Sequence, residues 1–204
     1  MSYITAYCHI NSENCQVNGA IVAENTGENW LKDLYLNLEI KYPKFHKMDT
    51  LSQVAFLASE YLIISNDGIS KYKEDEIALI FSNKTSSLNT DIKYENSYKN
   101  AGTASPAMFV YTLPNILIGE ISIRNKWYGE NMFTLFPTLN QKYFVDYPEA
   151  LLGEYTKACL CGWVEVNNNK IDAFLFFIEK KDSKQLNLLH TEKNIERLYK
   201  QANG

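Results

Sequence analysis

The side chains that could do chemistry are few and lie far apart in the sequence. The three histidines, His9, His46 and His190, have no carboxylate or cysteine at a diagnostic spacing. A histidine base needs such a partner to orient it or to be activated by it, so these three are expected to be structural or surface residues. The chain also has no GxSxG, P-loop, GxGxxG or HExxH pattern. The hydrolase, nucleotide-binding and zinc-protease chemistries of those motifs are therefore unsupported.

The four cysteines, Cys8, Cys15, Cys159 and Cys161, are too few for a disulfide scaffold in a chain of 204 residues. Cys159 and Cys161 would project from one face of a strand, because side chains alternate along strands. A metal or redox site there would need a CxxC spacing or a nearby histidine, and neither is present. We therefore expect buried, apolar thiols, and no metal or cofactor.

One segment has the pattern of a strand that feeds directly into a helix. Ser105-Pro106 opens the apolar run Ala107–Thr112, which we expect to be a buried strand. The spacing of the apolar residues in 116–123 fits either a helix or a strand. Pro114 favours the helix, because proline fits a first turn but removes a donor from a central strand. Such a junction presents a residue to a pocket and aims helix amides at developing negative charge.

The remaining elements alternate between the two types. Apolar spacing predicts a helix from Thr50, with Thr50 and Gln53 as a capping box. Asn167–Asn169 should turn a hairpin, and Thr191 should cap a short final helix. We expect further strands and one further helix in the following ranges: strands at 3–9, 77–81, 132–136, 157–166 and 171–180, and a helix at 139–152. This order predicts an α/β sandwich with a mixed sheet, parallel in the middle and antiparallel at one edge.

Charge and apolar composition argue against several kinds of partner and location for this chain. The net charge is −4 and the basic residues are scattered, which argues against a nucleic-acid partner. No apolar stretch is long enough to cross a bilayer, so no membrane association is expected. The N-terminus lacks the basic and apolar regions of a signal peptide, and the expected compartment is the cytoplasm.

Residues 105–115 resemble the nucleophile elbow of the β-ketoacyl synthases, members of the thiolase-like superfamily. Further similar segments occur in the family's order: residues 42–49, 77–91, 119–120 and 129–131. The similarity covers residues 40–136 and is greatest to short ketosynthase-like proteins of aryl-polyene and flexirubin pigment clusters. It implies one ketosynthase N-terminal-like domain over residues 1–204. The implied fold is a thiolase-like half of the βαβαβαββ type, with a mixed, mostly parallel five-stranded sheet sandwiched by helices.

Two departures from the family bear on activity. Aligning Thr112 with the family's threonine places Pro114 at the position of the nucleophilic cysteine. Proline has neither a thiol to acylate nor the backbone N–H that serves the oxyanion hole. The family is also about twice as long, and its catalytic histidines, or a histidine and an asparagine, lie in the C-terminal half. The resemblance therefore implies a chain that is not catalytic, with Thr112, Asn115 and Glu120 as candidates for a vestigial pocket.

Each of those three candidates has a second interpretation. Thr112 could replace the nucleophile only with a base, and none is in view. Glu120 is either a proton-handling carboxylate or a hydrogen-bonded structural residue. Asn115 would cap the helix or line the pocket.

The resemblance also implies partners. In the family the strand before the elbow meets its twin across a dimer axis, so Met108, Phe109, Val110 and Tyr111 are the expected dimer strand. The chain would then pair with itself or with a complete ketosynthase, and would meet an acyl carrier protein. Two alternatives stay open: an active condensing enzyme completed by a second chain, and a scaffold protein without an acyl pocket.

Overall fold

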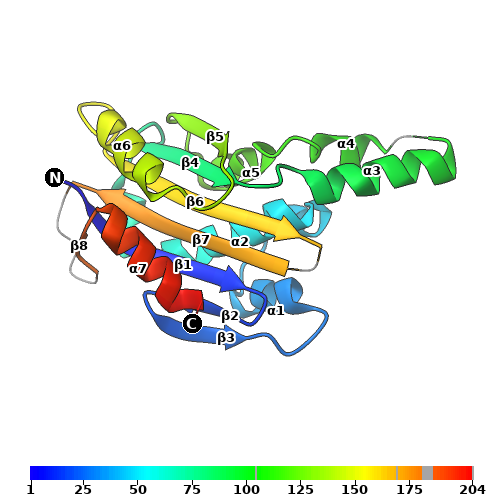
Figure 1. The fold of residues 1–204 in the computed structure, drawn as a ribbon, viewed down its shortest axis with the longest axis horizontal. Helices are drawn as coiled ribbons and strands as arrows, with labels where there is room; N and C mark the ends of the chain where they lie inside the picture. Colours follow the sequence, from blue (N-terminus) through cyan, green and yellow to red (C-terminus); the bar gives the residue numbers. More distant parts are fainter. Residues whose placement is uncertain (104, 169, 181–185, 204) are drawn as a thin grey trace.

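Strands pair into one sheet that has helices on both faces (Figure 1). The computed structural model describes residues 1–103, 105–168, 170–180 and 186–203. The strands are β1 (Tyr3–Asn11), β2 (Asn14–Val17), β3 (Ala20–Glu24), β4 (Ile77–Asn83), β5 (Asn131–Leu135), β6 (Ala158–Asn167), β7 (Lys170–Glu179) and β8 (Leu188–Leu189). The helices are α1 (Trp30–Asn37), α2 (Thr50–Ile64), α3 (Leu88–Ala101), α4 (Pro106–Val110), α5 (Ile116–Asn125), α6 (Gln141–Leu151) and α7 (Glu192–Asn203), with short 3-10 turns η1 (Pro43–Lys47) and η2 (Asp67–Lys71).

The strand order is β3-β2-β1-β7-β6-β4-β5, and β8 pairs with the start of β1. Only β4–β5 and β4–β6 are parallel among the described pairs. The mixed sheet is confirmed, but it has eight strands in the described residues rather than five, and most of its pairs are antiparallel. Two extra strands, β2 and β3, come from the β1–β2–β3 meander, and the third is β8. The second turn of the meander is Asn18-Gly19, with positive φ at both residues. That dipeptide is a strong hairpin signal, and the prediction missed it.

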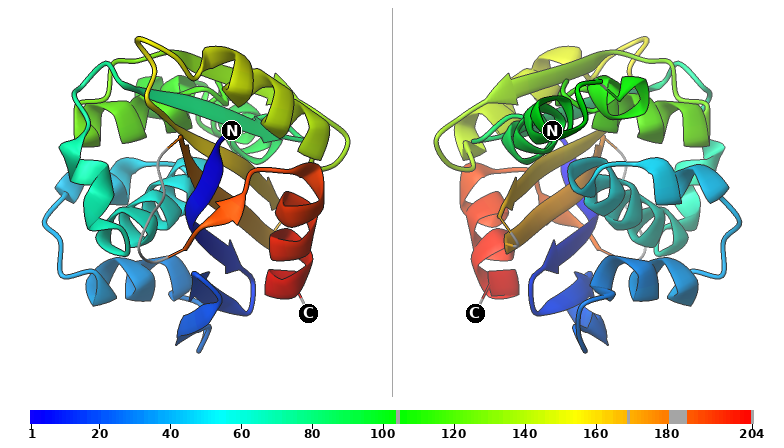
Figure 2. Two further views of the ribbon diagram at one scale, coloured as in Figure 1. Left: turned by 90° about the vertical axis from the view of Figure 1, so that its left-hand side faces the viewer. Right: turned by 90° about the vertical axis from the view of Figure 1, so that its right-hand side faces the viewer.

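The two faces of the sheet bury two separate clusters. In β4, Leu79 and Phe81 join the cluster beneath α1, α2 and α5. Ala78 and Ile80 join the other cluster, beneath α6 and α7. Because successive side chains point to opposite faces, a strand covered on both sides is apolar along most of its length, as Ile77–Phe81 is. This layering is seen end-on in Figure 2, with α2 and α7 on opposite sides of the strands.

Several predicted elements are confirmed by the structure, among them α2, β4, β5, α6 and the β6–β7 hairpin. Asn168 turns that hairpin with a φ of 52°, while Asn169 lies outside the described residues. The cap of α2 differs from the prediction: the Asp49 side chain accepts from the Ser52 N–H at 2.9 Å, and Thr50 is the first helical residue. Gly162 in β6 is required by packing, because a Cβ there would lie 2.6 Å from the Phe81 ring.

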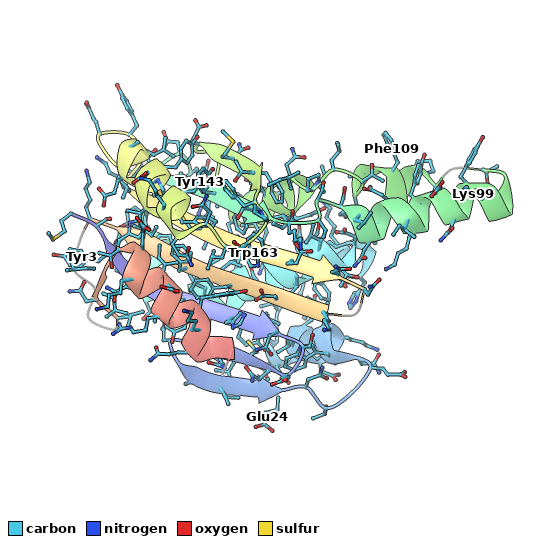
Figure 3. The ribbon with its side chains drawn as sticks, in the orientation of Figure 1. Tyr3, Glu24, Lys99, Phe109, Tyr143 and Trp163 are labelled. Carbon is cyan, nitrogen blue, oxygen red and sulfur yellow. The ribbon has the colours of Figure 1, made fainter. Side chains whose placement is uncertain are left out.

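The prediction of a buried strand at residues 107–112 is wrong. Residues 106–110 form α4, in which Ser105 Oγ accepts from the Met108 N–H at 3.3 Å and Pro106 occupies the first turn. Serine before proline is a helix-start signal, and here it decides the local structure against the apolar run. Phe109 is 57% exposed and points away from the sheet (Figure 3). Met108, Phe109, Val110 and Tyr111 therefore do not form a strand that could extend the sheet.

Across the described ranges, no helix combines the length and the apolar character that a membrane crossing requires.

Candidate functional site

A strand-to-helix junction exists in the protein, but it lies at residues 136–140. β5 is an edge strand, paired only with β4 among the described strands, and its C-terminus leads through these five residues into α6. Phe136 N–H donates to Asn83 O at 2.9 Å and ties the bend to β4. Asn140 caps α6 by accepting from the Tyr143 N–H at 3.0 Å. An edge strand that ends at a helix N-terminus is the arrangement that the family resemblance predicted for the elbow.

A second strand enters a helix through a short bend, from β4 to α3 across residues 84–87. This bend is closed by Glu165, whose Oε2 accepts from the Lys84 N–H at 2.7 Å and from the Thr85 N–H at 3.2 Å. β4 lies between β5 and β6, so it has no free edge at which a twin strand could add. The β5–α6 junction is therefore the better match.

The β5–α6 junction carries no thiol, imidazole or carboxylate. Its residues are Phe136, Pro137, Thr138, Leu139 and Asn140. Thr138 is the only hydroxyl among them and is exposed to solvent. A threonine nucleophile needs an adjacent base to remove its proton, and no hydrogen bond to Thr138 is found in the described residues.

All four cysteines are buried, and none belongs to the junction residues 136–140. Cys159 and Cys161 lie on β6 in the cluster under α6 and α7, and Cys8 and Cys15 lie in the opposite cluster. Burial raises the pKa of Cys159 to about 12 and raises that of Cys161 as well. Burial, and then the contact with Cys15, raises the pKa of Cys8. The thiolate is the reactive form, so none of these three is prepared for nucleophilic attack.

Pro114 does not lie at a strand-to-helix junction. It lies with Thr112 and Asn115 in the turn between α4 and α5. Thr112 Oγ1 donates to Phe109 O at 2.7 Å, and Asn115 is the N-terminal boundary of α5 with no side-chain capping bond. Because α5 packs in the cluster beneath α2, these residues belong to the opposite face of the sheet from α6. The placement of the nucleophile position at Pro114 is therefore corrected.

Glu120 is 3% exposed on α5 and has two partners. Its carboxylate forms an ion pair with Lys44 at 2.7 Å and accepts from Tyr111 Oη at 3.0 Å. Burial raises the pKa of Tyr111, and the bond to Glu120 raises it further. These contacts hold η1 and the end of α4 against α5. Among the described residues, Glu120 forms no hydrogen bond with Thr112 or Asn115.

A polar cluster that spacing could not reveal lies between the sheet and α7. His9 Nε2 lies 2.8 Å from Asp172 Oδ1, and Trp163 Nε1 donates to Asp172 Oδ2 at 3.2 Å. Tyr199 Oη also donates to Asp172. A histidine with an orienting carboxylate is the base pair of many nucleophilic enzymes. Here, however, His9 Nδ1 is buried and has no hydrogen-bond partner among the described residues, so the pair contacts no nucleophilic side chain there.

A second histidine cluster joins the N-terminus to α6. His190 Nε2 lies 2.8 Å from Phe144 O, and Nδ1 lies 3.0 Å from Ser2 Oγ, which in turn contacts Glu149. Burial lowers the pKa of His190 more than the Phe144 carbonyl and Glu149 raise it. Three or more potential metal ligands do not gather anywhere in the described part of the chain.

Comparison with known proteins supports the fold alone. No protein-family model matches the sequence, and no curated protein matches it significantly. A chain of the ketosynthase (ApeO) complex with its chain length factor (ApeC) from Xenorhabdus doucetiae is similar with a TM-score of 0.59 and 12% identity, over 100% of this chain and 92% of that chain. The ishigamide ketosynthase/chain length factor is similar with a TM-score of 0.61 and 15% identity, over 91% of this chain and 63% of that chain. A β-ketoacyl synthase from Burkholderia phymatum STM815 is similar with a TM-score of 0.63 and 10% identity, over 88% of this chain and 59% of that chain.

The protein therefore has a ketosynthase-like thiolase fold, with a mixed sheet flanked by helices as in a thiolase-like half. It spans 63% of the ishigamide chain and 59% of the Burkholderia chain, but 92% of the chain in the Xenorhabdus complex.

Proposed function

We propose that this protein is a non-catalytic ketosynthase-like subunit of a polyketide, polyene or fatty-acid pathway. The observation that carries the proposal is the chemistry of the β5–α6 junction, where residues 136–140 include no thiol. Condensation by this fold family requires a cysteine at such a bend. The cysteine is therefore missing at residues 136–140 rather than at Pro114, and the proposed role is non-catalytic in either case.

The proposed mode of assembly is pairing through β5, either with a second copy or with a complete ketosynthase. β5 replaces the α4 segment as the dimer-strand candidate because it lies at the edge of the sheet. An uncovered edge presents unpaired N–H and C=O groups that another strand can bind. A two-fold axis beside β5 would join the two sheets through antiparallel strands. The similar solved complexes, which join a ketosynthase to a chain length factor, support the heteromeric form.

An acyl carrier protein is the proposed further partner. One similar structure is a type II polyketide synthase acyl-carrier protein in complex with its ketosynthase, with a TM-score of 0.59 and 13% identity. That match covers 88% of this chain and 62% of the other. In the proposed role the carrier protein delivers its acyl chain to the partner ketosynthase rather than to this chain.

Intact-mass analysis tests the absence of catalysis. The protein is incubated with acyl-loaded carrier protein, and its mass should stay unchanged. A covalent acyl adduct would instead identify an active condensing or acyl-transfer enzyme. Affinity capture from the native cells, read by mass spectrometry, tests the pairing: a full-length ketosynthase should be recovered in a stoichiometric amount. Recovery of the chain as an isolated monomer without any ketosynthase would favour a scaffold protein.

A further inference from the structure

A hollow of about 950 Å³ lies at the end of the sheet where β1 and β6 finish. Its walls come from the loop before α1 and the first turn of α1, from η1, from the start of α2, from α3, and from the β6–β7 turn. Figure 1 shows α1 and α3 beyond the arrowheads of β1 and β6. No residue of the β5–α6 junction lines it. The hollow is therefore separate from that junction, and ligand binding in it does not depend on the proposed function.

The inner wall of this hollow is apolar. Trp30, Phe45 and Val166 line it and are almost fully buried, and Ile171 extends the surface along the start of β7. Apolar and aromatic walls with a few polar groups are typical of small-molecule sites, which occupy roughly 300–1,000 Å³. The size and the wall therefore suit an organic molecule better than a bare inorganic ion.

Hydrogen bonds within the chain hold the polar rim of the hollow in place. Asn25 Nδ2 donates to Ser12 O at 2.7 Å, and Asn89 Nδ2 donates to Val166 O at 3.0 Å. Gln53 Nε2 donates to Phe45 O at 3.1 Å and fixes the start of α2 against η1. A wall that is already held in place loses little conformational entropy when a ligand binds.

The charges around the hollow have an excess of positive sign, although the whole chain carries −4. Lys32 on α1 and Lys93 on α3 line it, against the single carboxylate of Glu28. Neither lysine forms an ion pair with any described residue. His46 on η1 adds a third nitrogen group to the rim. Cations contributed by separate elements around one apolar wall would attract an anion that carries an apolar body.

We propose that this hollow is a binding site for a small organic anion with an apolar body, such as an aromatic carboxylate. The apolar part would lie against Trp30 and Ile171, and the carboxylate would lie between Lys32 and Lys93. Two lysines are too few for a nucleic-acid track. The lining also lacks the grouped carboxylates or thiols that a metal ion would need.

The chain carries its own reporters for this site. It has three tryptophans, of which only Trp30 lines the hollow. The Trp30 indole N–H donates to Asn11 O at 3.0 Å, so its NMR signal is sensitive to displacement of this wall. The indole signals of ¹⁵N-labelled protein are assigned with Trp30→Phe and followed during titration with 2-naphthoate. We expect the Trp30 signal to shift saturably, with those of Trp127 and Trp163 unchanged.

Charge recognition is tested with a matched ligand and matched variants. The uncharged isostere 2-naphthamide should bind at least about tenfold more weakly than 2-naphthoate. The double variant Lys32→Gln/Lys93→Gln should bind 2-naphthoate more weakly than the wild type, by a similar factor. The control variant Lys73→Gln/Lys193→Gln removes the same net charge from exposed positions outside the hollow, and should change the affinity less than about twofold.

Each contrary result would overturn the inference. Absence of a saturable Trp30 shift at millimolar 2-naphthoate would show that no such ligand binds there. A shift at Trp163 or Trp127 instead of Trp30 would place binding elsewhere. Equal affinities for the acid and the amide, or equal weakening in both double variants, would show that the lysines do not select an anion.

Discussion

Arg124 and Glu60 join α5 to α2 through two hydrogen bonds, with Nε 3.1 Å from Oε1 and Nη2 2.9 Å from Oε2. Glu60 is buried, and the guanidinium also lies over the Tyr42 ring, 5.2 Å from its centroid. This pair fixes α5, and with it the turn that contains Pro114, to the α2 face of the sheet.

Breaking this pair from the arginine side should destabilise the fold. Arg124→Gln leaves the Glu60 carboxylate buried without its cation, and we expect the free energy of unfolding to fall by roughly 3 kcal/mol. Arg197→Gln is the matched control, because Arg197 is exposed on α7, and it should cost less than about 0.5 kcal/mol. Urea denaturation measures both. Equal losses in the two variants would show that the Arg124–Glu60 geometry contributes nothing specific.

The cysteines should resist alkylation while the protein is folded. With a pKa of about 12 for Cys159, only about 10⁻⁴ of that thiol is ionised at pH 8, and the ionised form is the reactive one. We expect no incorporation of iodoacetamide over minutes in native buffer and four adducts after unfolding, read by intact mass. Fast native labelling of any single cysteine would reveal an activated thiol and would contradict a non-catalytic role.

Local sequence signals predicted most of the elements. The helical spacing in residues 51–62 gave α2, the apolar run 77–81 gave β4, and the asparagine-rich turn gave the β6–β7 hairpin. Each of these signals is local and agrees with its tertiary surroundings. The run 107–112 was misread because a continuous apolar stretch does not separate a strand from a helix, and Ser105-Pro106 starts helices more often than strands.

The candidate site depended on relationships that no local pattern contains. The sequence has an apolar strand pattern before residue 114 and another before residue 137, and only the strand order shows that β5 holds the edge. His9 and Asp172 lie 163 residues apart in the chain and meet because β1 pairs with β7. Such partners follow from the topology of the sheet, which spacing alone does not determine.

His190 should make stability depend on pH. Burial lowers its pKa in the folded protein, whereas the unfolded chain takes up the proton near pH 6.5. Below that pH the unfolded state binds more protons, so stability is lost as the pH falls, by at most about 1.4 kcal/mol per pH unit from this group. His190→Gln, which can still donate to Phe144 O, should lose this component between pH 7.5 and 5. Parallel stability curves for the wild type and His190→Gln over this range would contradict the prediction.

The direction of the hydrogen-bonding groups along β5 decides how the proposed assembly can be tested. Leu79 N–H donates to Glu130 O at 2.8 Å, and Phe136 N–H donates to Asn83 O at 2.9 Å. Alternate residues of a parallel strand point their backbone groups to opposite sides. The even-numbered residues of β5 therefore face β4, and the N–H of Leu135 points outward from the sheet.

Leu135→Pro should consequently disrupt pairing at the edge while leaving the β4–β5 ladder intact. Proline is tolerated at an edge position whose N–H faces outward, and it removes the donor that an added strand would use. We expect the dissociation constant of a homodimer or of a ketosynthase complex to rise at least about tenfold, measured by analytical ultracentrifugation. Leu135→Ser removes the exposed apolar side chain but keeps the N–H, so it should weaken assembly less. Equal assembly by the wild type and the proline variant, with unchanged thermal unfolding, would exclude β5 as the interface.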